Sequence, residues 1–452
     1  MSSRSHPFTE PEPRRAFHVE SLGCAKNQVD SERMIAALVG AGWRLAAAPE
    51  EADVLIVNTC GFISSAKKES IETSLELKQR HPEKKVFMVG CLSERYGENL
   101  AQQLPEIDGF LGNRDPSRIV ELLAGGGPAA APPAGYRADE RKIHGVPWRE
   151  HLLSFPGSAY LKIAEGCQNR CTYCAIPLIR GDLASRQPAE VVEEARHLLD
   201  RGIRELVLIA QDLGSYGRDL GEPGLPRLLA ELSRIPGDYW VRLLYIHPDH
   251  FPDGILDVMA EDPRFLPYFD LPFQHAAPGI LRAMGRRGDP ESNLALLSRI
   301  RARLPAAVIR STFLLGFPGE TDSDFTELLS FQERARPDWL GCFTYSREED
   351  TPAWSMPGRV TKSAAERRKS EIEIRQGPIT QKSLDAHVGT TLDVLVEEQV
   401  QGEQLSLGRA YLQAPDVDGL VVVRASVQPG YRLAVRIERR NGVDLEGSPR
   451  ER

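Results

Sequence analysis

The chain has 452 residues, more than one hydrophobic core usually serves, so two or three domains are expected. A formal net charge of −8 argues against a protein that coats nucleic acid without specificity and allows a basic partner. The seven cysteines fit no small disulfide framework and favour a reducing cytoplasm with thiolates free for metal. The polar start lacks the apolar run of a signal peptide, and no long apolar stretch occurs, so we expect a soluble, cytoplasmic protein without membrane contact.

The first part of the chain alternates short apolar runs with amphipathic stretches, which predicts strands and helices in turn. The expected strands are 17–22, 53–57 and 85–90, and the expected helices are 27–42, 64–81, 98–104 and 117–124. This alternation predicts an open parallel sheet between layers of helices. The domain is expected at 16–125, and the Gly- and Pro-rich segment that follows predicts a linker at 126–153.

Three cysteines stand at equivalent points of this first domain. Cys24, Cys60 and Cys91 each follow the carboxyl end of a predicted strand. The carboxyl ends of parallel strands share one edge of the sheet, where ligands bind. The alternative for each cysteine alone is a small buried hydrophobe. Their common position favours a cluster held by three thiolates.

Within a second domain expected at 154–384, the stretch 156–346 repeats strand then helix about six times. The expected strands are 159–164, 205–210, 240–246, 268–273, 308–315 and 340–345. Six units are too few for a closed eight-unit barrel, so a partial, open (β/α)6 barrel is expected, with its site at the carboxyl ends of the strands. A charge-rich helix from 361 is expected to be interrupted by Pro378 and to serve as a connector.

The loop after the first barrel strand places Cys167, Cys171 and Cys174 at C-x₃-C-x₂-C spacing. Three thiolates can hold three corners of a cubane iron–sulfur cluster, which leaves one iron open. An open iron can take the amino and carboxylate groups of S-adenosylmethionine and pass an electron into its sulfonium. A structural zinc site is the alternative, but zinc usually takes four protein ligands, and this loop has no fourth Cys or His.

Two later loops of the barrel carry polar groups suited to S-adenosylmethionine. Gln211, Asp212 and Ser215 follow the second strand and are candidates for the methionine ammonium or carboxylate, while turn and helix-cap chemistry is the alternative. After the fifth strand, Gly316 allows close backbone approach to adenine, and Glu320 closes the same loop.

Two further residues of the barrel are assigned from their positions alone. His275 follows the fourth strand and is a candidate for a cofactor contact or a structural hydrogen bond. Cys342 lies inside the sixth strand and is expected to be a core residue. No catalytic residue beyond the cluster ligands is assigned.

The last segment, 385–452, changes to short alternating strands broken by glycine. The expected strands are 391–397, 405–411, 419–425 and 431–438. A small antiparallel barrel of about five strands, like an OB-type fold, is expected.

Across these parts the chain resembles the methylthiotransferases. The motifs Leu-Gly-Cys-Ala-Lys-Asn-Gln at 22–28 and Asn-Thr-Cys-Gly-Phe-Ile-Ser-Ser at 58–65 are similar to the branch that modifies a ribosomal protein. The cysteine loop resembles the radical S-adenosylmethionine (radical SAM) signature, and the segment 408–419 resembles the TRAM module.

The resemblance implies an enzyme that attaches a methylthio group to the β-carbon of an aspartate in small-subunit ribosomal protein twelve. It implies two 4Fe–4S clusters, with S-adenosylmethionine serving as methyl donor and as radical source. It also implies an electron donor such as flavodoxin or ferredoxin. An unactivated C–H bond offers no acidic proton to an ordinary base, which is why such chemistry needs a radical.

Two other functions compete with this interpretation. One is the same chemistry on a tRNA adenosine, and the other is a ribosome- or RNA-binding module with structural clusters. From 387 to 452 the chain has ten acidic residues against eight Arg and no Lys, whereas an RNA binder should show a basic face. The charge balance favours a basic ribosomal protein over direct RNA binding, although an Arg stripe on the last barrel would suit phosphate.

Overall fold

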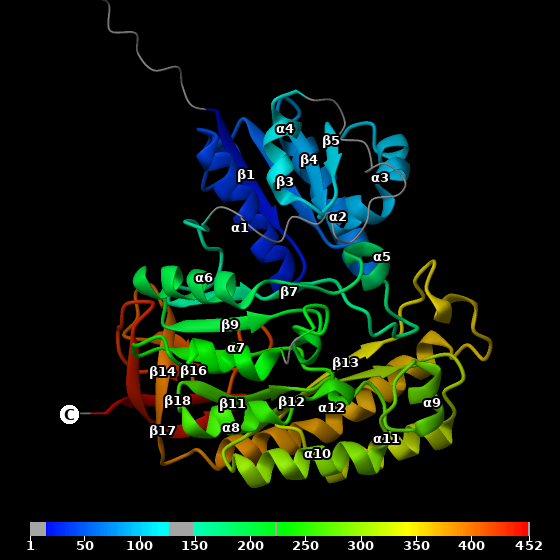
Figure 1. Cartoon of the computed structure of the whole chain (residues 1–452), viewed down its shortest axis with the longest axis vertical. Helices are drawn as coiled ribbons and strands as arrows, with labels where there is room; N and C mark the ends of the chain where they lie inside the picture. Colours follow the sequence, from blue (N-terminus) through cyan, green and yellow to red (C-terminus); the bar gives the residue numbers. More distant parts are fainter. Residues whose placement is uncertain (1–14, 126–147, 222–223, 451–452) are drawn as a thin grey trace, which may run out of the picture. The chain divides into compact units, whose positions relative to one another are not determined.

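The computed structural model describes residues 15–125, 148–221 and 224–450. The chain forms two compact units, Met1–Leu152 and Leu153–Arg452 (Figure 1). Most of the linker expected at 126–153 lies outside the described residues, and the four segment boundaries given above stay predictions. None of the helices in the described ranges is both long enough and apolar enough to span a membrane.

The first unit contains a five-stranded parallel sheet in the order β2-β1-β3-β4-β5. Its strands are β1 Ala16–Ser21, β2 Arg44–Leu45, β3 Val54–Thr59, β4 Lys85–Gly90 and β5 Gly109–Leu111. Its helices are α1 Ala25–Gly40, α2 Ser64–Arg80, α3 Cys91–Gln103 and α4 Ile119–Leu123, with 3₁₀ turns η1 Pro49–Glu51 and η2 Pro116–Arg118. The expected parallel α/β domain is confirmed. The sequence missed β2 and β5 because two or three residues carry no readable alternation.

The second unit contains a six-stranded sheet in the order β13-β12-β11-β10-β9-β6, and every pairing in it is parallel. Its strands are β6 Ser158–Lys162, β9 Glu205–Ile209, β10 Trp240–Leu243, β11 Phe265–Asp270, β12 Val308–Leu315 and β13 Trp339–Thr344. Its helices are α6 Pro188–Asp200, α7 Leu225–Leu232, α8 Gly254–Glu261, α9 Pro278–Ala283, α10 Pro290–Arg303 and α11 Asp322–Ala335. The partial barrel predicted from six repeats is confirmed.

Shorter elements complete this part of the second unit. They are the two-stranded sheet of β7 Ala164–Glu165 and β8 Ala184–Ser185, helix α5 Ile176–Arg180, and the 3₁₀ turns η4 Leu213–Ser215, η5 Pro248–His250 and η6 Pro352–Ser355. The β7–β8 pair brackets the cysteine loop and was not predicted, since each strand has only two residues.

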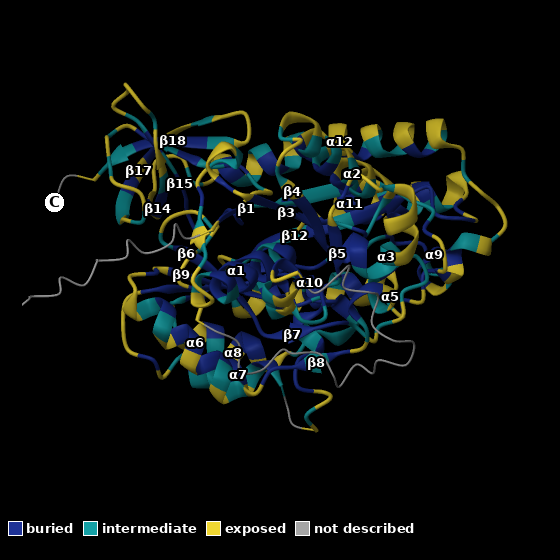
Figure 2. Cartoon of the chain, turned by 90° about the horizontal axis from the view of Figure 1, so that it is seen from above, coloured by how far each residue is buried: buried dark blue, intermediate teal, exposed yellow. Residues whose placement is uncertain are grey.

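Helix α12, Lys362–Asp385, continues through Pro378, so the expected interruption is wrong. A proline costs the bond to the carbonyl four residues earlier, here that of Ile374. Ile374 and Pro378 are both exposed, which leaves that carbonyl accessible to water. On the opposite, buried side of α12 (Figure 2), Gln332 donates to the carbonyl of Ile372 at 3.0 Å and Gln376 donates to that of Pro337 at 2.8 Å. These tertiary bonds hold the helix where its own ladder is broken.

The C-terminal segment closes into the predicted five-stranded barrel, in the order β14-β15-β16-β18-β17. It was expected to be antiparallel throughout, but β16 pairs with β18 in parallel. Its strands are β14 Thr391–Gln399, β15 Ser406–Arg409, β16 Val421–Val423, β17 Arg432–Asn441 and β18 Asp444–Pro449. Closure removes free strand edges, so this small barrel exposes no unpaired ladder.

The small barrel lies beside the amino ends of the six-stranded sheet (Figure 1), and a buried ionic network joins the two. Arg409 donates to Glu205, the first residue of β9, at 2.6 Å, and Arg242 donates to the same carboxylate at 2.7 Å. Burial alone would raise the pKa of Glu205, but the two guanidinium groups outweigh it and lower that pKa to about 2. Arg242 also donates to the carbonyls of Tyr411 and Ala410. The small barrel of β14–β18 therefore packs directly on the six-stranded partial barrel.

Candidate metal centres and cofactor pocket

The structure places Cys24, Cys60 and Cys91 at one edge of the first sheet, as predicted. Cys24 precedes α1, Cys60 directly follows β3, and Cys91 is the first residue of α3 after β4. The strands β1, β3 and β4 are neighbours with parallel pairing, so their carboxyl ends coincide. Thiols at or near helix N-termini are where a thiolate is electrostatically favoured.

Two glycines let the three cysteine-bearing loops touch. A Cβ on Gly23, whose φ is +92°, would lie 3.0 Å from Cys60 Cβ. A Cβ on Gly61 would lie 2.7 Å from the carbonyl oxygen of Cys91. Any larger residue at Gly61 would push two of the loops apart. Close approach of the loops therefore depends on these glycines.

Asn27, on the first turn of α1, links all three loops. Its amide nitrogen donates to the carbonyls of Leu22 at 3.0 Å and Thr59 at 2.8 Å. Its amide oxygen accepts from the Cys91 thiol at 3.2 Å, and the Asn58 side chain donates to its backbone carbonyl at 2.7 Å. The sequence motifs contain both asparagines, but their role in holding the loops together was missed, because the partners are more than thirty residues apart in sequence.

The cysteine loop of the second unit is shaped by its own backbone. Gly166 has φ +69°, and a Cβ there would lie 2.0 Å from the carbonyl oxygen of Asp182. The amide of Cys167 donates to the carbonyl of Gly181, and that of Cys174 donates to the carbonyl of Cys171, each at 3.0 Å. These backbone bonds keep the three cysteines on one tight segment, and their binding of a cluster stays a prediction.

Burial makes these thiols reluctant to ionise by themselves. It raises the pKa of Cys167 to about 11 and that of Cys174 to about 12. A cation that binds them must displace their protons, which couples metal binding to pH. The isolated Cys342 is buried in β13, where burial raises its pKa to about 12, and its assignment as a core residue is confirmed.

Asp212 is the node of a hydrogen-bond network beside the cysteine loop. Its carboxylate accepts from the side chains of Asn169 at 2.9 Å and Ser215 at 2.6 Å, and from the backbone amide of His247 at 3.0 Å. His250 Nδ1 lies 3.0 Å from it. Burial would raise the pKa of Asp212, but bonds from His250, Asn169 and Ser215 lower it to about 2. This anion ties the cysteine loop to the loops after β9 and β10, and a contact of Asp212 or Ser215 with the cofactor stays a prediction.

Gln211 and His275 offer buried polar atoms to a ligand. The amide nitrogen of Gln211 and the Nε2 atom of His275 are buried without a hydrogen-bond partner in the described structure. His275 Nδ1 accepts from the amide of Ala277 at 3.0 Å, and burial lowers the pKa of His275 to about 4. Such orphaned atoms are uncommon in folded proteins and fit a site that receives a ligand.

The loop after β12 is held by Glu320. Its carboxylate accepts from the amides of Gly316 at 2.5 Å and Phe317 at 3.1 Å, and from Arg368 at 2.8 Å. Gly316 has φ +77°, and a Cβ there would lie 2.5 Å from Ala365 Cβ of α12. Glu320 therefore fixes the loop, while its contact and that of Gly316 with the cofactor stay predictions.

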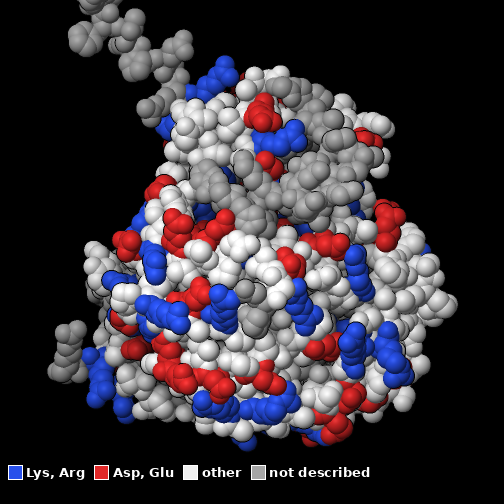
Figure 3. All heavy atoms as spheres, viewed as in Figure 1, with Lys and Arg blue, Asp and Glu red and all other residues white. Residues whose placement is uncertain are grey.

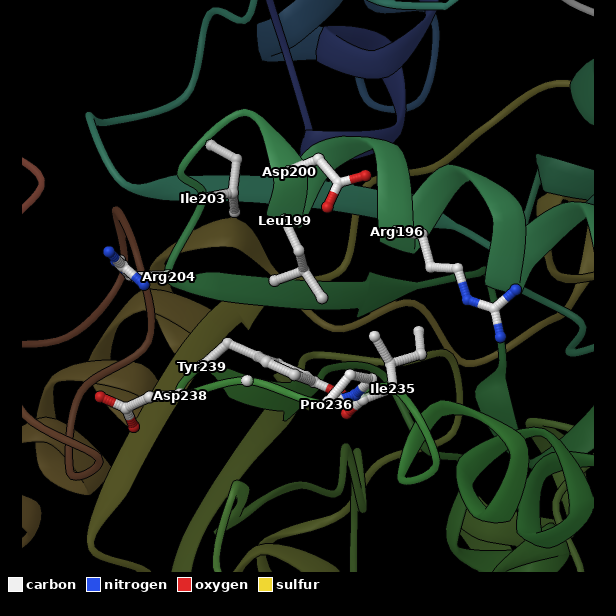
Figure 4. Close-up of a pocket in the computed structure, with 10 residues that line it drawn as sticks. Arg196, Leu199, Asp200, Ile203, Arg204, Ile235, Pro236, Asp238 and Tyr239 are labelled. Atoms are coloured by element: carbon white, nitrogen blue, oxygen red, sulfur yellow. Dashed lines mark hydrogen bonds between the residues drawn. The ribbon is translucent and has the colours of Figure 1, made fainter.

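Two cavities lie at opposite ends of the barrel. One, of about 480 Å³, lies between α6 and the turn before β10, where Leu199 of the helix faces Tyr239 of the turn and Arg196 and Asp238 lie on opposite sides (Figure 4). It opens at the amino ends of the strands. The other, of about 390 Å³, adjoins the cysteine loop and includes Asn169 among its lining residues. The second cavity is the one placed for the chemistry.

Three family models match the chain in order. Uncharacterized protein family UPF0004 matches residues 16–112, the Radical SAM superfamily matches 161–331, and the TRAM domain matches 388–449. Ribosomal protein uS12 methylthiotransferase RimO of Treponema denticola is 45% identical, over 94% of this chain and 98% of that protein. The protein of the same name from Aquifex aeolicus is 41% identical, over 96% and 97%. The chain belongs to the RimO methylthiotransferase family.

Solved structures agree with the RimO fold described here. TsrM of Kitasatospora setae, a radical S-adenosylmethionine methyltransferase, matches with a TM-score of 0.58 at 17% identity, over 75% of each chain. OxsB, a cobalamin-dependent S-adenosylmethionine radical enzyme, matches with a TM-score of 0.52 at 10% identity, over 82% of this chain and 56% of that one. At these identities the likeness concerns the fold alone.

Membership of the RimO family confirms that the chain is a radical SAM methylthiotransferase, which uses S-adenosylmethionine and 4Fe–4S clusters. The prediction of an enzyme is therefore confirmed, and the relatives do not favour the tRNA-modifying alternative. The donor set fits, because each of the two sites offers three cysteine thiols, the residue type that holds iron–sulfur clusters.

Proposed function

We propose that this enzyme attaches a methylthio group to the β-carbon of an aspartate in ribosomal protein uS12. The observation that carries the proposal is the 45% identity to the RimO protein of Treponema denticola across 94% of the chain, which spans all three parts of the molecule. The site is chemically suited to the reaction, because it offers two separate sets of three thiols and a pocket beside one of them.

Cys167, Cys171 and Cys174 are proposed to hold the cluster that binds S-adenosylmethionine. When bound, this cluster supplies the electron that cleaves S-adenosylmethionine to a radical able to remove an unactivated hydrogen. The chain's own residues position it. Gly166 turns the backbone into the loop, and Asp212 holds the loop through Asn169. A displaced loop would place the open iron wrongly relative to the barrel.

The proposed cofactor contacts divide into two kinds. Gln211 has a buried amide nitrogen to donate to a carboxylate, and this supports direct contact with the methionine part. Asp212, Ser215 and Glu320 already use their oxygens within the protein, so they act by fixing the loops around the cofactor. Gly316 keeps its backbone close to the same site because no side chain fits between it and α12.

Cys24, Cys60 and Cys91 are proposed to hold the second cluster, which serves sulfur insertion and methylation. Three residues that are not ligands support the arrangement. Asn27 joins the three loops by hydrogen bonds, and Gly23 and Gly61 let them approach. The thiols then depend on the register of the sheet for their relative positions.

A basic ribosomal protein suits the charge of this chain better than RNA does. Three of the four arginines that would form a phosphate-binding stripe on the last barrel are paired with acids; the four are Arg424, Arg432, Arg436 and Arg439. Arg424 pairs with Glu438 at 2.8 Å, and Arg439 pairs with Glu446 at 2.6 Å. On the face of Leu153–Arg452 shown in Figure 3, acidic and basic residues alternate without a continuous basic field. Engaged arginines bind phosphate poorly, which supports a protein substrate.

The proposed partners are uS12, free or within the ribosome, and a one-electron donor such as flavodoxin or ferredoxin, in the cytoplasm. The test is a mass measurement on a uS12 peptide after anaerobic incubation with reconstituted enzyme, S-adenosylmethionine and a chemical reductant. We expect the peptide to gain a methylthio group, and a peptide with the target aspartate changed to alanine to gain nothing. Modification of an anticodon stem-loop in place of the peptide would move the enzyme to the tRNA branch.

A further inference from the structure

The cysteine loop forms a continuous surface with the segment after α9. The amide of Thr172 donates to the carbonyl of Met284 at 3.0 Å, and its hydroxyl donates to that of Ala283 at 2.7 Å. A Cβ on Gly285 would lie 3.2 Å from the carbonyl oxygen of Arg170. Gln168, Arg170 and Gly285 are exposed, so this surface faces solvent within the second unit.

This surface is basic in a chain of net charge −8. Arg218, Arg282 and Arg287 are exposed, and their side chains form no ion pair with the described residues. We call these three the basic patch. Arg170, on the loop itself, is paired with Asp182 at 2.6 Å. Arg334 pairs with Glu291 at 2.7 Å, whereas Arg436 and Arg450 of the last barrel are exposed without an ion pair among the described residues. What distinguishes the basic patch is its place, because Arg218 and Arg287 line a cavity beside the cysteine loop. The basic patch thus keeps its charge available to a partner.

The cavity of about 390 Å³ connects the basic patch to the cysteines. Arg218 and Arg287 line it together with Asn169, His247 and one acid, Asp249, whose carboxylate accepts from the backbone amide of Arg287 at 2.8 Å. Nε2 of His247 lies 4.0 Å from Cys171 Sγ. Its Nδ1 accepts from the amide of Asp249 at 3.2 Å, so the ring proton sits on Nε2 and points at the sulfur. A group seated in this cavity is separated from a proposed cluster ligand by one imidazole ring.

The reaction needs an electron from outside the barrel, because cleavage of S-adenosylmethionine consumes one electron. A protein carrier must come close to the cluster to deliver it. The substrate does not fit the basic patch, since a ribosomal protein that binds RNA phosphate is itself basic. An acidic carrier fits, because opposite charges speed encounter.

We propose that Arg218, Arg282 and Arg287 surround the docking site of an acidic one-electron carrier protein, which reduces the cluster across the cavity at His247. This rests on the proposed function and assigns a surface to its electron donor. In the step the carrier is oxidised by one electron and the cluster is reduced by one, so no bond forms or breaks.

The test compares R218E/R287E with R436E/R450E. Each double variant replaces two exposed arginines with glutamates, so the net charge changes equally, but the control changes lie on the last barrel. Stopped-flow absorbance follows reduction of the cluster by reduced flavodoxin at ionic strengths of about 0.01 M and about 1 M. The methyl viologen radical, a small cation that needs no basic docking site, serves as the second reductant. Electron paramagnetic resonance checks that each variant carries the cluster.

At low ionic strength we expect R218E/R287E to react with flavodoxin about tenfold more slowly than the unaltered enzyme, and within about twofold at high ionic strength. Reduction by viologen should not slow, and R436E/R450E should match the unaltered enzyme. Equal flavodoxin rates in both variants would overturn the docking site. Equal slowing with viologen, or a raised KM for the uS12 peptide under viologen, would also overturn it. Modification of uS12 under viologen tests the proposed function separately.

Discussion

The cysteines of the first unit come from three separate strand ends, whereas those of the second unit share the segment 167–174. In the first unit, Cys24, Cys60 and Cys91 are placed by the parallel pairing of β1, β3 and β4 and by the bonds of Asn27. In the second, the backbone conformation of one loop sets the positions of Cys167, Cys171 and Cys174. The first arrangement therefore depends on long-range packing and the second on local conformation, which predicts that they respond differently to substitution.

The largest expected effect is at the loop. Replacing Cys167, Cys171 and Cys174 with alanine should abolish S-adenosylmethionine cleavage and lower iron from about eight to about four per chain, since two clusters of four irons become one. Iron analysis and chromatography of 5′-deoxyadenosine measure both. Cys342→Ala, a buried cysteine outside both sets, serves as the control. Full iron in the triple variant would refute the assignment.

The matching change in the first unit should separate the two functions. Replacing Cys24, Cys60 and Cys91 with alanine should also halve the iron and end methylthio transfer to the peptide. Cleavage of S-adenosylmethionine should stay within about threefold, because the loop holds its own cluster. If a folded variant lost both activities, the two sites would not be independent.

Arg409→Met tests whether iron binding by Cys167, Cys171 and Cys174 depends on contacts at the amino ends of the barrel strands. The change leaves Glu205 short of one buried partner and should cost about 3–5 kcal/mol of unfolding free energy. Denaturant titration measures it. We expect the iron content at low temperature to stay near that of the unaltered enzyme, since Arg409 lies at the amino ends of the strands. If only the iron bound by the cysteine loop were lost, the loop would depend on more than its own backbone conformation.

The same network predicts an acid dependence. The pKa of Glu205 is lowered to about 2 in the folded protein, so its ionised form contributes stability above the usual glutamate range. This contribution, up to about 3 kcal/mol, should be lost as pH falls from about 4.5 toward 2. Glu205→Gln should flatten this part of the pH profile of unfolding. An unchanged slope would mean that other carboxylates dominate.

Asn27→Leu should have the smallest effect on stability and the most selective effect on metal. It removes two donated bonds and leaves the carbonyls of Leu22 and Thr59 unpaired, at a cost of about 1–3 kcal/mol. Iron from the first unit should fall while cleavage of S-adenosylmethionine persists. Asn441→Leu, at the exposed end of β17, is the control. Equal iron content in both variants would show that Asn27 does not hold the three cysteine-bearing loops in place.

The features that could be predicted from the sequence are the local ones, and those that could not depend on long-range packing. The loop cysteines, the strand ends beside Cys60 and Cys91, and the order of three segments depend on spacing and alternation, which a sequence displays. The role of Asn27, the use of Asp212 to hold a loop, and the pair of Arg409 with Glu205 depend on partners far away along the chain. The continuity of α12 through Pro378 depends on which side of a helix meets water, which tertiary packing decides.

The pair of Glu205 and Arg409 has a consequence for biosynthesis. A ribosome adds Glu205 to the chain 204 residues before Arg409, so the Glu205 carboxylate stays without this partner while the chain between them is added. The amino end of the barrel is completed only when β15 arrives. The loop at 167–174 is made earlier still, so its local backbone turns can form before the amino end of the barrel is closed.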